Sequence, residues 1–261
     1  MDLLLQGRAV AVTGGSAGIG RAVTLGLLAE GAWVGVCARR RDKLDSLMAE
    51  AGDHADRLYI TTADVRDDAQ VGAFIDGTAS QFGGLDGLVA NAGTGTGGNL
   101  FDSPLDTFTT QMDIKVNAGL RTIRAALPHL RQSDAARIVV INSITAHAPE
   151  RQMAAVGAAR AALSNAAALM ATELAPEGIC VNRVNLGPIV TEQQRVNHAA
   201  SGSAKTYENW LIDNAKQRGI PVGRMGTPAE VVPWVLLLLS PLAGFTTGAD
   251  ISVAGGMGIR V

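Results

Sequence analysis

Cysteine, aromatic side chains and net charge are all scarce in this sequence. Among 261 residues there are two cysteines, Cys37 and Cys180, which stand far apart in apolar runs without the spacing of a metal site. We expect buried free thiols, no metal and a reducing, cytoplasmic compartment. A formal net charge of -2 provides no general attraction to nucleic acid or to an anionic membrane. The expected partner is therefore a small-molecule substrate.

Long hydrophobic runs and targeting segments are also missing. The apolar stretch from Trp234 to Leu239 is too short to span a bilayer, and no basic segment precedes an apolar one at the N-terminus. We expect neither export nor membrane insertion. With 47% hydrophobic and 18% charged residues, the chain has the composition of a globular protein and the length of a single sizeable domain.

Glycine, in contrast, is abundant, and one glycine-rich stretch dominates the start of the chain. Residues 9–13 form a short apolar run, which predicts a strand buried on both faces of a parallel sheet. Helical spacing of apolar side chains follows from Arg21 to Glu30. The chain must turn sharply between them, and the N-terminus of the helix would then bind a dinucleotide pyrophosphate. A tight turn that binds no ligand is the alternative interpretation.

Further along the chain, apolar runs alternate with segments of helical periodicity. This alternation predicts a Rossmann-type doubly wound parallel sheet, a three-layer α/β/α fold in a single domain. The expected strands are 33–37, 58–63, 87–90, 137–142, 180–186 and 250–253, and the expected helices are 42–51, 68–82, 104–129, 153–175 and 228–239. A long polar insertion, 191–219, carries one amphipathic piece at 207–216 and is a candidate lid over a substrate.

The spacing within the glycine-rich stretch resembles the fingerprint of the short-chain dehydrogenase/reductase family. Thr13-Gly14 is followed by three residues and then by Gly18-Ile19-Gly20. Other short motifs resemble the same family in the same order, over essentially the whole chain. The resemblance implies cofactor contacts by Gly14, Ser16, Gly18, Ile19, Gly20, Asp64, Val65, Asn91, Ala92, Gly93, Gly187, Ile189 and Thr191.

Two arginines at the end of the second expected strand indicate which cofactor is bound. An acidic residue at this place would accept hydrogen bonds from a ribose 2'-hydroxyl, but the strand ends in Arg39 and Arg40. Guanidinium groups suit a 2'-phosphate, and charge-assisted hydrogen bonds contribute roughly 1.5 to 3 kcal/mol each. The sequence therefore predicts NADP rather than NAD, although NAD remains possible. A solvated basic start to a helix is the alternative.

The catalytic positions depart from the family pattern that the resemblance implies. The family uses a serine, a tyrosine thirteen residues later as acid/base, and a lysine four residues after that. Counting from Ser143 gives Val156 and Arg160 instead. Valine donates no proton, whereas Arg160 can still hydrogen-bond the hydroxyl groups of the cofactor ribose. Counting from the following helix likewise places Lys115, and not Asn117, where the family has an active-site asparagine.

Three residues are candidates for the missing acid. Lys115 is the first choice, because burial near a cofactor lowers the pKa of an ammonium group; a purely electrostatic or solvent-directed lysine is the alternative. His147 has a suitable intrinsic pKa but is more typical of a solvated loop histidine. Tyr207 lies on the lid and forms an i, i+3 pair with Trp210 that ordinary packing also explains. Tyr59 begins the third strand, far from the expected site.

These observations leave three functional hypotheses open. The first is an NADP(H)-dependent oxidoreductase for a small carbonyl, alcohol or imine substrate, with Ser143, Arg160 and Lys115 as its catalytic residues. The second is a nucleotide-binding protein without redox turnover, and the third is an isomerase or dehydratase on the same scaffold. The small residues of the helix 153–175, together with the family resemblance, predict a homodimer or homotetramer.

Overall fold

Seven parallel strands form one sheet in the part of the chain that the computed structural model describes, residues 1–258. Their spatial order is β3-β2-β1-β4-β5-β6-β7, and all neighbouring strands run parallel. Since the order reverses between β1 and β4, the carboxyl ends of these two strands leave a crevice. The strands are β1 Ala9–Thr13, β2 Trp33–Ala38, β3 Leu58–Thr62, β4 Gly87–Ala90, β5 Arg137–Ser143, β6 Cys180–Leu186 and β7 Asp250–Val253.

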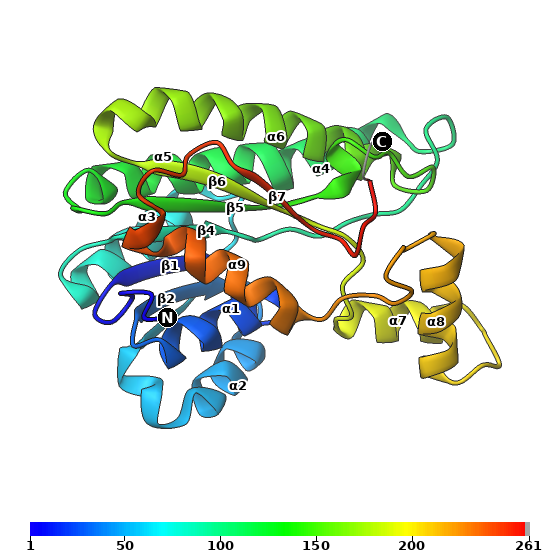
Figure 1. The fold of residues 1–261 in the computed structure, drawn as a ribbon, viewed down its shortest axis with the longest axis horizontal. Helices are drawn as coiled ribbons and strands as arrows, with labels where there is room; N and C mark the ends of the chain where they lie inside the picture. Colours follow the sequence, from blue (N-terminus) through cyan, green and yellow to red (C-terminus); the bar gives the residue numbers. More distant parts are fainter. Residues whose placement is uncertain (259–261) are drawn as a thin grey trace.

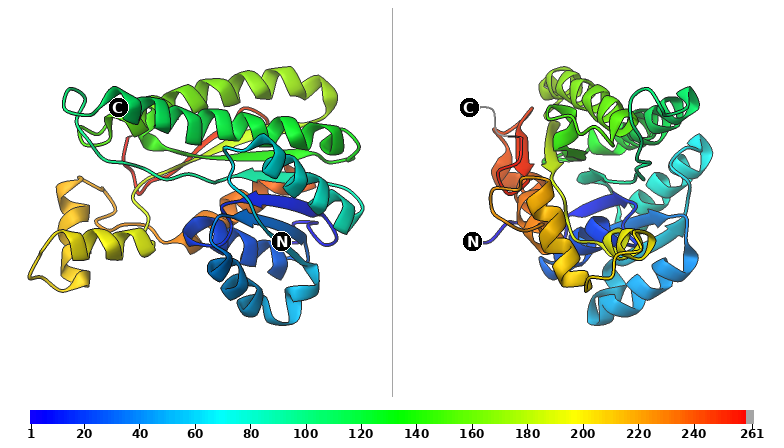
Figure 2. Two further views of the ribbon diagram at one scale, coloured as in Figure 1. Left: turned by 180° about the vertical axis from the view of Figure 1, so that it is seen from behind. Right: turned by 90° about the vertical axis from the view of Figure 1, so that its right-hand side faces the viewer.

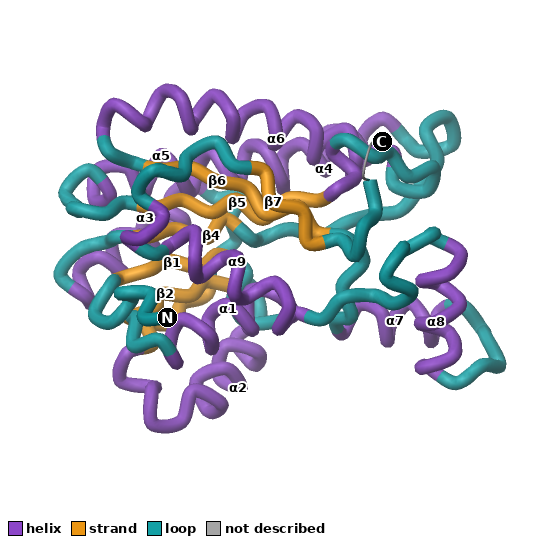
Figure 3. Tube along the Cα trace, in the orientation of Figure 1, coloured by secondary structure: helices purple, strands orange, loops and turns teal. Residues whose placement is uncertain are grey.

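Helices cover both faces of the sheet, which lies between them in Figure 3. On one face α3, α5 and α6 enclose a core that contains Phe74 and Leu163, and on the other α1, α2 and α9 enclose Leu27 and Val235. The predicted three-layer, Rossmann-type single domain is thus confirmed. The α-helices are α1 Gly18–Ala29, α2 Arg41–Ala51, α3 Asp68–Phe82, α4 Leu105–Met112, α5 Ala118–Leu130, α6 Ala154–Leu174, α7 Glu192–Ala200, α8 Tyr207–Gln217 and α9 Pro228–Leu239.

Side-chain caps fix where two of these helices begin. The Asp67 carboxylate accepts hydrogen bonds from the backbone N–H groups of Ala69 and Gln70, at 2.9 and 3.0 Å, and so starts α3. The Glu230 carboxylate reaches back to the backbone N–H of Thr227 at 2.8 Å and starts α9. Both caps satisfy N–H groups that a helix terminus leaves without a partner.

The structure differs from the sequence-based prediction in two helical regions. The helix expected at 104–129 is divided into α4, a π-helical turn at Asp113–Asn117 and α5. The insertion 191–219 carries two helices, α7 and α8, where one was expected. Both project from the edge of the molecule at which β6 ends (Figures 1 and 2). The first half of this insertion is strongly polar, and its sequence therefore gave no apolar periodicity from which α7 could be predicted.

The long apolar helix α6 belongs to the protein core. Together with the short turn that follows it, the segment 154–177 is long and apolar enough to cross a membrane by length and composition alone. Its side chains Leu163, Ala167 and Met170 are buried in the core beside α5 and the sheet. Burial against a sheet explains the apolar composition, so we interpret α6 as a core helix.

Candidate functional site

A cleft of about 470 Å³ opens at the carboxyl ends of the strands, where their order reverses. Ligands of open α/β sheets bind at such switch points. The cleft collects most of the residues that the family resemblance assigned to the cofactor. Its lining includes Gly14, Ser16, Gly18, Ile19, Gly20, Arg39, Arg40, Asp64, Val65, Asn91, Ala92, Gly93, Arg160 and Thr191.

The turn between β1 and α1 requires glycine at two of its positions. Gly14 has a φ of +66°, which other residues rarely adopt, and a Cβ on Gly20 would collide with the Gly14 carbonyl oxygen and with Asn91 Nδ2. Asn91 ties β4 to this turn, because its Nδ2 donates to the carbonyl oxygens of Thr13 and Gly14 at 2.9 and 3.2 Å. The residue before α1, Ala17, provides no side-chain cap. The first N–H groups of α1 can therefore face a phosphate.

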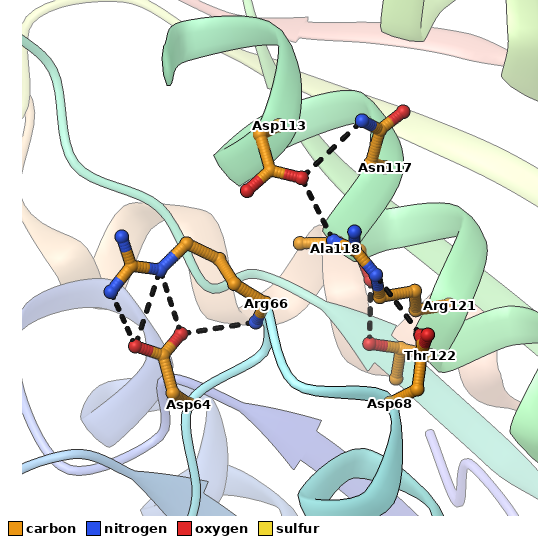
Figure 4. Close-up of polar contacts among 8 residues, drawn as sticks. All are labelled: Asp64, Arg66, Asp68, Asp113, Asn117, Ala118, Arg121 and Thr122. Carbon is orange, nitrogen blue, oxygen red and sulfur yellow. Dashed lines mark hydrogen bonds and ion pairs between the residues drawn. The ribbon is translucent and has the colours of Figure 1, made fainter.

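Charged side chains surround the part of the cleft beyond β2 and β3. Arg39 and Arg40 are exposed at its rim. Asp64 is held by Arg66, whose Nη2 lies 2.6 Å from Asp64 Oδ2 and whose Nε lies 3.0 Å from Oδ1 (Figure 4). Hydrogen bonding to Arg66 lowers the pKa of Asp64 to about 2. Asp64 therefore stays ionised, with much of its acceptor capacity already used.

Four residues that were assigned to the site do not line the cleft: Lys115, which is described below, and Gly187, Ile189 and Ser143. Gly187 packs against Ala254, where an added Cβ would collide with the backbone. Ile189 is buried and forms a bridge to Gly226. Ser143 ends β5, and its Oγ accepts hydrogen bonds from the backbone N–H and the hydroxyl of Thr145, at 3.2 and 3.0 Å.

Val156, where counting along the sequence predicts the family's tyrosine, does not line the cleft. Its side chain is 4% exposed at the start of α6. Gly95 lies directly on it, since a Cβ on Gly95 would come within 3.5 Å of Val156 Cγ2 and within 3.8 Å of the Met153 methyl group. The larger side chain of a tyrosine at position 156 would therefore meet the loop after β4.

Lys115 points inward from the π-helical turn and is 3% exposed, whereas Asn117 points to solvent. The Lys115 ammonium donates to the carbonyl oxygen of Thr94 and to Gln111 Oε1, the latter at 2.6 Å. Burial, and after it the positive charge of Arg160, lowers the pKa of Lys115 from 10.5 to about 7. Lys115 lines a small void of about 10 Å³ rather than the large cleft.

Arg160 lines both the large cleft and the small void beside Lys115, and so lies between them. Its Nη1 donates to the carbonyl oxygen of Ile141 at 2.6 Å, while its Nε is buried without a hydrogen-bond partner. A Cβ on Gly93 would come within 3.8 Å of its Nη2. Burial lowers the pKa of Arg160 to about 10, so the group remains a cation near neutral pH.

The other acid candidates lie elsewhere. Tyr207 begins α8 and packs within the insertion 191–219, with Arg195 4.5 Å above its ring and the rings of His198 and Trp210 beside it. Ordinary packing thus explains Tyr207. His147 follows the turn after β5 and lies near Gly258. Tyr59 packs on Gly77 of α3.

Sequence reasoning missed several residues that shape this site. Gln111 lies one turn before Lys115 and is 1% exposed; the i, i+4 spacing of an amide and an ammonium group could have revealed it. Arg66 lies two residues after Asp64, and its proximity could have indicated the ion pair. No periodic signal predicted the approach of Gly95 to Val156. The first turn of α7 also lines the cleft, through Glu192, Gln193 and Val196.

Comparison with known proteins connects the fold to a family. A family model described as enoyl-(acyl carrier protein) reductase matches residues 14–258. A 3-oxoacyl-[acyl-carrier-protein] reductase of rhamnolipid biosynthesis from Pseudomonas aeruginosa is 31% identical over 257 residues, which are 97% of this chain and 96% of that protein.

Two solved structures are similar over nearly the full length. An NADPH-bound short chain oxidoreductase from Pseudomonas aeruginosa PAO1, described as containing an atypical catalytic center, is 35% identical with a TM-score of 0.92, over 98% of this chain and 99% of that one. L-Sorbose reductase from Gluconobacter frateurii, in complex with NADPH and L-sorbose, is 28% identical with a TM-score of 0.94, and all of each chain is covered. With the family model, these likenesses show that the chain belongs to the short-chain dehydrogenase/reductase family of NAD(P)H-binding oxidoreductases.

Proposed function

We propose that this protein is an NADP(H)-dependent oxidoreductase that acts on a small carbonyl or imine substrate without a tyrosine acid. The observation that carries the proposal is the pair of cations at the catalytic position. Lys115 is buried beside Arg160, where its ammonium has a pKa of about 7. A proton donor of that pKa is matched to neutral pH.

The cofactor would occupy the cleft. The glycine turn and the uncapped start of α1 fit a pyrophosphate, and Arg39 and Arg40 fit a 2'-phosphate, which favours NADP over NAD. The bound nicotinamide would supply the hydride. Arg160 would hold the ribose hydroxyls that the family's lysine holds.

Lys115 would deliver the proton from behind the wall of the cleft. Its Nζ contacts the Thr94 carbonyl, and Thr94 lines the cleft. The void that it shares with Arg160 has room for about one water molecule, through which a proton can pass. The segment 191–219 would act as the lid, since Thr191 and the first turn of α7 line the cleft.

The test is a screen that follows NADPH oxidation with ketones, quinones and cyclic iminium ions side by side. An iminium ion carries its proton already and needs no acid. Lys115→Met should therefore slow carbonyl reduction by about 100-fold or more and leave iminium reduction and NADPH affinity unchanged. Equal effects on both substrate classes would contradict a role for Lys115 as the acid.

A second candidate function is nucleotide binding without redox turnover. The loop at Gly95 packs on Val156 and so fills part of the space in which a substrate would meet an acid. NADPH binding without oxidation by any substrate of the screen would favour this candidate.

A further inference from the structure

The charges that line the cleft are unbalanced. Three lining residues are arginines, Arg39, Arg40 and Arg160, and two are acidic, Asp64 and Glu192. Both acidic residues already have a cationic partner: Asp64 contacts Arg66 at 2.6 Å, and Glu192 lies 3.5 Å from Lys43. Neither of these two carboxylates forms an ion pair with Arg160.

Arg160 and Lys115 hydrogen-bond only to neutral acceptors. These acceptors are the carbonyl oxygens of Ile141 and Thr94 and the side-chain oxygen of Gln111. Among the described residues, no carboxylate lies within ion-pair distance of either cation. Two adjacent, uncompensated cations in a largely enclosed place are costly to bury.

A neighbouring cation, Arg121, has carboxylate partners (Figure 4). Arg121 on α5 lies 3.0 Å from Asp68 and 2.9 Å from Asp113. Asp113 is only two residues from Lys115, yet its carboxylate is held by Arg121 and Asn117. Among the described residues, carboxylates thus pair with the half-buried Arg121 and not with Arg160 or Lys115.

We propose that the missing counterion is the substrate itself, a small carbonyl or imine compound that carries a carboxylate. Arg160, besides its contact with the cofactor ribose, would be the direct partner of that carboxylate. This inference rests on the proposed function and names its substrate class. The phosphates of the cofactor would be bound elsewhere, at α1 and at Arg39, whereas Arg160 lies on α6 one turn after Val156. Lys115 stands behind Arg160 and adds positive potential without reaching the cleft.

The experiment compares benzoate with benzamide, two probes that are nearly equal in shape and differ in charge. Calorimetry would measure both affinities for the protein alone and for the protein saturated with NADP⁺, which also blocks Arg39 and Arg40. We expect benzoate to bind at least about tenfold more tightly than benzamide in both cases, since a charge-assisted hydrogen bond replaces a neutral one.

Three variants locate the effect. Arg160→Gln should abolish the preference for benzoate, and Arg160→Lys should retain it. Lys115→Gln should reduce the preference severalfold, and it serves as the second test if Arg160→Gln does not fold. Equal affinities for the two probes, or a preference that survives Arg160→Gln, would overturn the inference. NADPH oxidation by an iminium ion that carries no carboxylate tests the proposed function separately. A normal rate with this compound, combined with equal binding of benzoate and benzamide, would refute only the substrate class.

Discussion

Lys115→Met should change how the stability of this protein depends on pH. In the folded protein the Lys115 ammonium is 3% exposed, and its pKa is lowered from 10.5 to about 7. Between these two pH values the unfolded chain binds more protons than the folded one, so the free energy of unfolding rises with pH. Below about pH 7 both states are charged, and the full cost of burying the cation is present.

The size of this effect follows from the shift. Each pH unit between the two pKa values raises the free energy of unfolding by about 1.4 kcal/mol. Between pH 7 and 9 the increase is therefore about 3 kcal/mol. A methionine has no proton to release, so the stability of Lys115→Met relative to the native protein should be greatest at pH 6. Part of that gain is offset, because Thr94 and Gln111 lose a donor.

Urea denaturation at intervals from pH 6 to pH 9 measures the difference directly. The native curve should rise relative to that of Lys115→Met across this range. Lys216→Met, which removes an exposed ammonium on α8, is the matched control, and its curve should run parallel to the native one. Parallel curves for the native protein and Lys115→Met would refute the lowered pKa and, with it, the acid role of Lys115.

Three further predictions follow from other parts of the structure. Arg39→Gln should weaken NADPH binding by about tenfold or more in a calorimetric titration, whereas Arg41→Gln, outside the cleft, should not; equal affinities would remove Arg39 from the site. Val156→Tyr should lower the free energy of unfolding by about 1 to 3 kcal/mol without improving ketone reduction, and a stable, faster variant would contradict the packing of Gly95. Sedimentation should give a species larger than the 26.9 kDa monomer, since Leu169 on the small-residue helix α6 is 56% exposed.

The sequence was most informative where structure is set locally. The strand, turn and helix at residues 9–29 depend on an apolar run and on glycines with fixed spacing, and the structure places them as expected. Counting against the family pattern selected Lys115 rather than Asn117 as the residue that faces the site, and in the structure Lys115 is buried whereas Asn117 is exposed. Local rules suffice in these cases because each feature is determined within one or two turns of the chain.

Features that depend on contacts between distant segments were not predictable in this way. The π-helical turn at Asp113–Asn117 changes the hydrogen-bond register of one helix, and no residue type specifies it. The loop at Gly95 follows β4 but packs on α6, sixty residues later in the chain.

The departures at Val156, Arg160 and Lys115 are best understood as one change rather than three. Val156 is buried with the loop at Gly95 beside it, and a phenol in its place would meet this loop. The guanidinium of Arg160 is fixed by Ile141 and cannot give up its proton near neutral pH. Under the proposed function the ionisable role would therefore fall to Lys115, whose pKa of about 7 depends on burial and on the charge of Arg160. Because each residue sets the environment of the next, restoring a tyrosine alone should not restore the family's usual chemistry.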